Sequence, residues 1–241
     1  MPLHPAETFP ALGALPFLRA AFLLRSPGID VLADRETVLQ RLWSAHHAAK
    51  DSLGFAGMPL ATAGQVHGNR LAMVEPTTPF PVPEVDGLIT TRPGLCLGIY
   101  VADCAAVYIA DKHGRGIALA HSGKKGTELG ITRNAISELC NATGAAPGDL
   151  VVQISPCIRP PHYEINFAAD IARQARDAGV ESVHDCGSCT ASDPASYYSY
   201  RRELGRTGRM LALLALVGSN SQFSNRSGCQ TPLVVIESQI R

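Results

Sequence analysis

The sequence predicts an α/β (α+β) fold in which a mixed β-sheet core is flanked by helices. Two observations favour this fold. Apolar runs of strand length are interspersed with segments of helical periodicity. The strands and helices do not alternate regularly, whereas an all-parallel sheet would require regular alternation. The 241 residues are 46% hydrophobic and 17% charged, which is apolar enough for a sizeable core. Because no linker or shift in composition divides the chain, residues 1–241 are expected to form a single domain.

Three segments have the apolar spacing of helices that bury one face. The first covers residues 36–53, and Asp34 is placed to cap its N-terminus. The second covers residues 127–143 and the third about 167–178. A glycine follows each of these two, as is common at helix C-termini.

Short apolar runs bounded by turn residues predict the strands. In chain order they cover residues 22–24, 71–75, 87–91, 96–101, 105–110, 116–120 and 150–154. A further strand is expected to begin at Val183, whereas residues 210–217 fit either a strand or a buried helix. Residues 219–241 are expected to form a C-terminal tail, in which the polar segment 219–228 leads to a last strand at 233–237.

Charge and cysteine content exclude several classes of protein. Lys and Arg number 21, as do Asp and Glu, so the formal net charge is +0 and no basic surface for nucleic acid is expected. No apolar run is long enough to cross a bilayer, and the N-terminus lacks the basic segment of a secretory signal. An odd number of cysteines, spread along the chain, argues against a disulfide scaffold. We therefore expect a cytoplasmic protein that binds neither nucleic acid nor membrane.

Three residues of the kinds that bind metals end or interrupt apolar strands. His67 precedes the strand at 71–75, Cys104 lies between two apolar runs, and His121 ends the strand at 116–120. Two imidazoles and a thiolate suit Zn²⁺, and three protein ligands leave a fourth position open, as in catalytic zinc sites. Their spacing follows no zinc-finger pattern, so two satisfied polar histidines and a small buried cysteine are the alternative.

A candidate anion site follows His121. Residues 122–127 join its strand to the helix expected at Thr127, where free N–H groups would lie beside Lys124 and Lys125. The pattern is not a Walker loop, because Ala118 stands where that loop needs its first glycine. The alternative is a solvated turn that carries two lysines.

A series of short motifs occurs in a characteristic order. They read QVHG (65–68), DGLIT (86–90), PGLCLGI (93–99), ADC (102–104), AHSG (120–123), GT (126–127), SPCI (155–158), YEI (163–165), CT (189–190), YSYRR (198–202) and TGR (207–209). The chain thereby resembles the laccase-domain family, also called multicopper polyphenol oxidase or YfiH-like proteins, most strongly over residues 65–216. The resemblance implies that His67, Cys104 and His121 bind one Zn²⁺ ion. It also implies a fold similar to the catalytic domain of cytotoxic necrotizing factors.

The implied activity is purine nucleoside chemistry. Phosphorolysis of adenosine, inosine or methylthioadenosine would give the base and a pentose 1-phosphate, and adenosine deamination is a second implied activity, for which zinc would activate a water molecule. The partners would then be small molecules, a purine nucleoside and phosphate. The oxidase name fits the residues poorly, because multicopper sites need more histidine ligands and the chain contains no His-x-His pair.

Two departures from the family's pattern affect the expected substrate site. Relatives usually carry Trp-Arg in place of Lys124 and Lys125, and lysine lacks both the fork of arginine and an aromatic surface. Arg25 matches an N-terminal arginine of the family, but the Leu-Asn segment that should follow is missing. Arg25, Gln65, Lys124, Lys125 and Thr127 are the expected substrate or phosphate contacts; a surface arginine is the alternative for Arg25.

The catalytic residues suggested by the sequence are Asp103 and Cys104. Asp103 would donate a proton beside the metal if the strand turns there; the alternative is a carboxylate that forms a turn or orients a ligand histidine. Cys104 as a nucleophile with His121 as its base would instead make the protein a cysteine hydrolase or deamidase. A third hypothesis is a non-enzymatic factor for binding or peptidoglycan maintenance, stapled by zinc.

Other suggestive features are interpreted as incidental. Cys186 and Cys189 resemble a redox dithiol but lack the strand–helix context of one. The arginines of the last two motifs, at 201, 202 and 209, could serve the site or form structural ion pairs.

Overall fold

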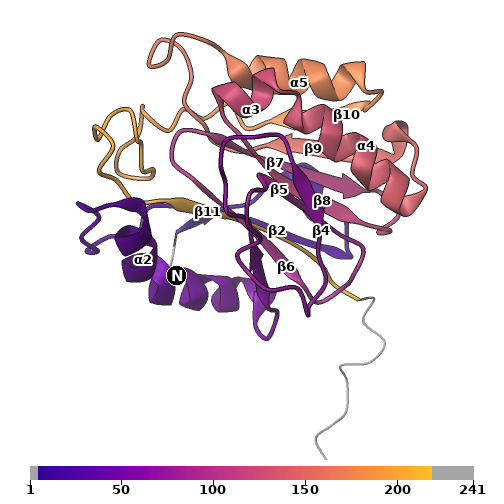
Figure 1. The fold of residues 1–241 in the computed structure, drawn as a ribbon, viewed down its shortest axis with the longest axis horizontal. Coiled ribbons are helices and arrows are strands. Elements are labelled where there is room, and N and C mark those ends of the chain that lie inside the picture. Colours follow the sequence, from indigo (N-terminus) through magenta and orange to yellow (C-terminus); the bar gives the residue numbers. More distant parts are fainter. Residues whose placement is uncertain (1–4, 219–241) are drawn as a thin grey trace, which may run out of the picture.

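Two mixed β-sheets pack face to face in the computed structural model, which describes residues 5–218 (Figure 1). The first sheet has the order β1 (Ala6–Glu7), β2 (Leu18–Leu23), β11 (Met210–Leu216), β6 (Cys96–Val101) and β3 (Leu60–Thr62). The second has the order β10 (Ser182–Asp185), β9 (Leu150–Ile154), β7 (Ala105–Asp111), β8 (Ile117–Ser122), β5 (Gly87–Thr90) and β4 (Leu71–Met73). The central pairs are antiparallel, while β3, β4 and β10 each join an edge in parallel.

Helices cover the outer faces of both sheets (Figure 1). The first sheet is covered by α2 (Arg35–Lys50), which continues as a π-helical segment at Asp51–Phe55. The second is covered by α4 (Ile131–Thr143) and α5 (Phe167–Asp177), with the short α3 (Lys124–Glu128) beside them. The remaining helical elements are α1 (Pro10–Gly13) and a 3-10 turn at Pro147–Asp149.

The central strands are buried on both sides, which explains why they read as continuous apolar runs. In β7, Tyr108 packs between the sheets, whereas its neighbour Val107 packs toward α4 and α5. In β11, Leu214 belongs to the layer between the sheets and Leu213 to the layer under α2. The alternation of side chains along each strand thus ties three apolar layers together.

The predicted fold class is confirmed, with two mixed sheets in place of one. The predicted helix at 36–53 corresponds to α2 and the π-helical segment, and Asp34 caps it by accepting a hydrogen bond from the Thr37 amide at 3.0 Å. Residues 210–217 form a strand, because β11 fills the centre of the first sheet. The predicted strand at 233–237 and the tail 219–241 lie outside the described residues.

The predicted boundaries of helices and strands are wrong where tertiary packing determines the position of a turn. The predicted helix at 127–143 is wrong at its start: α3 begins at Lys124, and Gly130, with a left-handed φ of 79°, separates it from α4. The short elements β1, α1 and β3 were not predicted, because two to four residues carry no usable periodicity. Within residues 5–218, no helix is long and apolar enough to span a membrane.

A buried hydrogen bond joins the two sheets and provides a test of their packing. The Tyr108 hydroxyl, in β7, donates to the Ala21 carbonyl of β2 at 2.8 Å, and Tyr108 is fully buried. We predict that Tyr108→Phe lowers the free energy of unfolding by about 1 kcal/mol, because the Ala21 carbonyl loses this donor. Denaturant unfolding measures the change. The half-exposed Tyr200→Phe is the control and should alter stability by less than about 0.5 kcal/mol; equal stabilities of the two variants would contradict the prediction.

Candidate metal centre

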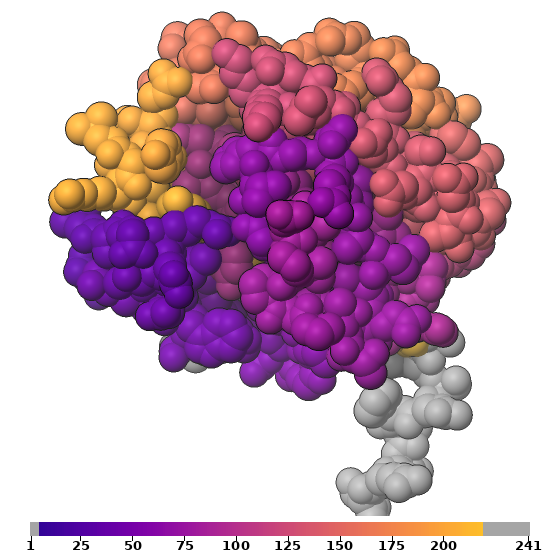
Figure 2. All heavy atoms as spheres, in the orientation of Figure 1, coloured from indigo at the N-terminus to yellow at the C-terminus, as the bar shows by residue number. Residues whose placement is uncertain are grey.

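A cavity of about 810 Å³ opens at one end of the two sheets. Its walls come from the C-terminal ends of β6 and β8, from the residues that precede β7 and β11, and from α2 and α3. In the space-filling view, the surface is hollowed where the indigo α2, the purple segment that follows it and the yellow segment before β11 approach one another (Figure 2). The volume lies within the range of about 300–1,000 Å³ that is typical of small-molecule sites.

The three predicted metal ligands converge in this cavity. The ligand atoms of His67, Cys104 and His121 all lie within 4.8 Å of one another. The two imidazole rings meet edge to face, with their centroids 4.8 Å apart. One Zn²⁺ ion with bonds of about 2.0–2.3 Å requires such a cluster, and an imidazole–thiolate donor set suits it. The residues present therefore fit a zinc ion.

Gly123 makes room for the sulfur of this cluster. A Cβ atom at that position would lie 2.4 Å from Cys104 Sγ, which is closer than any non-bonded contact allows. The glycine follows β8 directly, so the AHSG motif supplies both a ligand, His121, and the space beside it. The requirement for glycine here is steric.

The central residue that the sequence analysis missed is Asp86. Its buried carboxylate accepts hydrogen bonds from the backbone amides of Val66, His67 and Gly68 at 3.1, 2.9 and 2.7 Å. The same carboxylate lies 2.8 Å from His121 Nδ1. With Nδ1 donating to Asp86, the Nε2 atom of His121 is left to bind a metal. One carboxylate thus holds two of the three ligands.

The hydrogen bonds of Asp86 also determine its charge. Burial alone would raise the pKa of this carboxyl, but hydrogen bonds from His121 and from the loop amides lower it below its ordinary value. The carboxylate is therefore ionised. No local pattern signals this role, because its partners lie about 20 and 35 positions away along the chain.

A strained loop carries His67. Gln65 and His67 have left-handed φ angles of 59° and 60°, a conformation that side chains other than glycine rarely adopt. Gln65 Nε2 donates to the Tyr100 carbonyl at 2.6 Å, and the Tyr100 amide donates to Gln65 Oε1 at 3.1 Å. Gln65, an expected substrate contact, lines the cavity, and these two bonds use its side chain to anchor the loop to β6.

The cluster has strongly perturbed acid–base properties. Burial alone would raise the pKa of the Cys104 thiol, but the positive charges and hydrogen bonds of His121 and His67 lower it to about 6. For His121, burial opposes protonation, while Cys104 and Asp86 raise the pKa to about 9. Without a metal, these values describe a thiolate beside an imidazolium.

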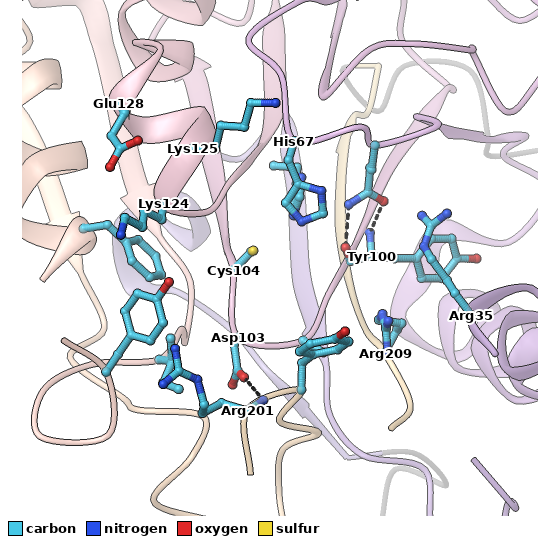
Figure 3. Close-up of a pocket in the computed structure, with 17 residues that line it drawn as sticks. Arg35, His67, Tyr100, Asp103, Cys104, Lys124, Lys125, Glu128, Arg201 and Arg209 are labelled. Atoms are coloured by element: carbon cyan, nitrogen blue, oxygen red, sulfur yellow. Dashed lines mark hydrogen bonds between the residues drawn. The ribbon is translucent and has the colours of Figure 1, made fainter. Parts of the chain in front are cut away.

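Asp103 turns the chain and points away from the cluster. Its φ of 78° provides the turn that the sequence analysis required between β6 and Cys104. Its carboxylate accepts hydrogen bonds from Thr190 Oγ1 at 2.7 Å and from the Arg201 amide at 2.6 Å (Figure 3). The carboxylate of Asp103 therefore connects the turn between β6 and β7 to the two loops that carry Thr190 and Arg201.

The expected anion site at Thr127 is not formed as predicted. Because α3 begins at Lys124, the Thr127 amide is already bonded to the Gly123 carbonyl, and Thr127 Oγ1 donates to the same oxygen at 2.7 Å. Thr127 is buried and does not line the cavity, whereas Lys124 and Lys125 do. Glu164 lies between two cations: its carboxylate is 4.0 Å from Lys124 Nζ and 3.2 Å from Arg201 Nη2.

Arg25, an expected substrate contact, does not line the cavity. Its Nη2 atom forms an ion pair with Glu203 at 2.9 Å and donates to the Tyr197 carbonyl. Its guanidinium also stacks over the Tyr198 ring at 4.3 Å. These contacts give Arg25 a structural role, because they link the end of β2 to the segment before β11.

Comparisons with known proteins show which family the chain resembles. Residues 31–174 and 166–217 match the family described as multi-copper polyphenol oxidoreductase laccase. A Mycobacterium tuberculosis protein named purine nucleoside phosphorylase is 30% identical over 189 residues, or 68% of this chain and 74% of the relative. A Deinococcus radiodurans protein of the same name is 30% identical over 244 residues, or 84% of this chain and 93% of the relative.

Two solved structures share the fold. YlmD from Geobacillus stearothermophilus superposes with a TM-score of 0.73 at 24% identity, covering 85% of this chain and 93% of YlmD. A Neisseria meningitidis protein superposes with a TM-score of 0.75 at 20% identity, covering 89% of this chain and 99% of that protein. At these identities, the likeness concerns the fold alone.

The double role of Asp86 gives a prediction about metal affinity. We predict that Asp86→Asn weakens zinc binding by about 10- to 100-fold, because an amide NH₂ cannot accept the hydrogen bonds that orient His121 and the His67 loop. Competition with a chromophoric chelator measures the affinity. Asp30→Asn, which removes an exposed carboxylate, is the matched control. Zinc affinity of Asp86→Asn equal to that of the control would contradict the prediction.

The lowered pKa of Cys104 gives a prediction for metal-free protein. Because the folded-state pKa is about 6, the thiolate persists on acidification until the pH falls through that value. Alkylation by iodoacetamide, followed by mass spectrometry, should reach half its maximal rate near pH 6, well below the value of about 8.5 for an ordinary thiol. Cys96, whose pKa burial raises to about 12, should stay unmodified. Zinc should protect Cys104, and a midpoint above pH 8 would contradict the assignment.

Proposed function

The chain belongs to the family described as multi-copper polyphenol oxidoreductase laccase, and we propose that it acts as a zinc-dependent purine nucleoside phosphorylase. The observation that carries the proposal is the grouping of two imidazoles and one thiolate on the wall of a cavity large enough for a nucleoside. The names of the relatives at 30% identity support the substrate class.

The donor set favours this reaction over an oxidase. His67, Cys104 and His121 supply two nitrogens and one sulfur, whereas multicopper centres require several more histidine ligands. Zinc has no accessible second oxidation state, so it cannot pass electrons to oxygen. Among the described residues, no second group of three His, Cys, Asp or Glu side chains lies close enough together to hold another metal ion.

The proposed reaction is a substitution at the anomeric carbon of the nucleoside. A phosphate oxygen forms a bond to that carbon while the bond to the purine nitrogen breaks. The electron pair of the broken bond leaves with the purine, which takes up the proton that the phosphate loses. Bound zinc would supply a Lewis acid at this end of the cavity that stabilises developing negative charge. The role of the chain is to hold both substrates in line in a confined site.

Three groups of residues have distinct roles in this proposal. His67, Cys104 and His121 would hold the zinc, and Asp86 orients His121 through Nδ1. Asp103 is a positioning residue, because its two oxygens accept hydrogen bonds from Thr190 Oγ1 and the Arg201 amide. We therefore assign Asp103 the turn-forming role, whereas the residue that orients a ligand histidine is Asp86.

A second candidate function is favoured by one observation. The pKa of Cys104 near 6, with His121 beside it, matches the thiolate of a cysteine hydrolase or deamidase. The two functions place opposite demands on the sulfur, because a thiolate bound to zinc is not available as a nucleophile. Metal content and activity measured on the same protein separate them.

The test measures metal content, base release and ammonia release together. We predict one zinc ion per chain and release of adenine from adenosine only when phosphate is present, with an equal amount of pentose 1-phosphate. His67→Ala and Cys104→Ala should each lower this activity by about 100-fold or more, because metal binding needs all three ligands. Cys140→Ala removes a thiol on α4, outside the cavity, and should leave activity unchanged.

Three other outcomes would contradict the proposal. Equal adenine release without phosphate would indicate hydrolysis. Ammonia and inosine without base release would indicate deamination alone. Activity on amides in metal-free protein, abolished by Cys104→Ser, would indicate the cysteine hydrolase.

A further inference from the structure

Two arginines line the cavity without a carboxylate partner. Arg35 is the first residue of α2, and Arg209 directly precedes β11. In the close-up they lie on the same side of the cavity, next to Tyr100 and across from Lys124 (Figure 3). Among residues 5–218, no Asp or Glu oxygen lies within 4.0 Å of either guanidinium, although most other arginines of the fold are paired.

The geometry of Arg209 leaves its binding edge available. Its Nη1 atom donates to the Thr207 carbonyl at 2.9 Å and to the Gly208 carbonyl at 2.8 Å. These bonds fix the orientation of the side chain and use both Nη1 hydrogens. The Nε and Nη2 hydrogens remain, and they form the edge with which arginine grips an oxyanion in two parallel hydrogen bonds.

The two like charges are costly in the free protein. Burial lowers the pKa of Arg209, and the positive charge of Arg35 lowers it further, against smaller opposing effects of Tyr200, Cys104 and Asp103. A partly buried cation beside a second cation, with no counter-ion, is unfavourable unless a ligand supplies the negative charge. The missing partner is therefore an anion that enters the cavity.

The opposite side of the cavity is less suited to a phosphate group. Glu164 already compensates Lys124 and Arg201. Lys125 is exposed and presents a single ammonium group, which lacks the planar fork of arginine. This contrasts with the sequence-based expectation, which placed phosphate at the two lysines.

We propose that Arg35 and Arg209 form the phosphate subsite of this cavity. The inference rests on the proposed function, in which inorganic phosphate is the second substrate. It places phosphate on the side of the cavity formed by α2. The nucleoside would then lie between the phosphate and the metal centre.

Phosphate binding, measured without turnover, tests the subsite. Inorganic phosphate is titrated into the zinc-containing protein by isothermal titration calorimetry. We predict that Arg35→Gln and Arg209→Gln each weaken phosphate affinity about tenfold or more. Arg206→Gln removes an equally charged, exposed side chain three positions before Arg209 and should leave affinity unchanged. In the steady state, KM for phosphate should rise in the two variants while KM for the nucleoside stays within about twofold.

The outcomes separate the subsite from the proposed function. Phosphate affinity lost in both arginine variants of a protein that releases no base would support the subsite and overturn the phosphorylase. Wild-type affinity in both variants, loss in Lys125→Gln instead, or no phosphate binding by the wild type would overturn the subsite. If circular dichroism shows that Arg209→Gln is unfolded, Arg35→Gln decides the question, since the side chain of Arg35 is exposed.

Discussion

The site depends on one buried carboxylate. Asp86 accepts three hydrogen bonds from the amides of the His67 loop and a fourth from His121, so it fixes two ligands that lie far apart in the sequence. A buried charge is tolerated only where donors surround it, and here those donors are the elements that must be positioned. The left-handed backbone at Gln65 and His67 persists because Asp86 and β6 hold the loop on both sides.

The double-sheet framework explains why such a site can be rigid. The central strands are buried on both faces, and the cavity forms where β6 and β8 end and where β7 and β11 begin. Cys104 directly precedes β7, and Arg209 directly precedes β11. Neither strand can shift without disturbing the three packed layers. Asp103 extends the same framework to the loops that carry Thr190 and Arg201.

Charge is distributed unevenly around the cavity, and this asymmetry bears on function more than the fold does. On one side Glu164 forms ion pairs with Lys124 and Arg201, while Arg35 and Arg209 face the cavity without an acid. The fold alone could serve many reactions, as shared folds commonly do. The donor set argues against the electron transfer that the family's description suggests, and the uncompensated arginines argue for an anionic substrate.

Local patterns in the chain were enough to predict the strands at 96–101 and 150–154 and the N-cap at Asp34, and the resemblance to a family identified the three residues that meet in the cavity. These follow from periodicity, short-range hydrogen bonds and short motifs. The folded chain was needed to show that Asp86 orients His121, that Arg25 pairs with Glu203, and that Arg35 and Arg209 share a cavity. Each of these relations joins segments distant along the chain, and which distant groups meet is set by packing of the sheets, a property that no local pattern encodes.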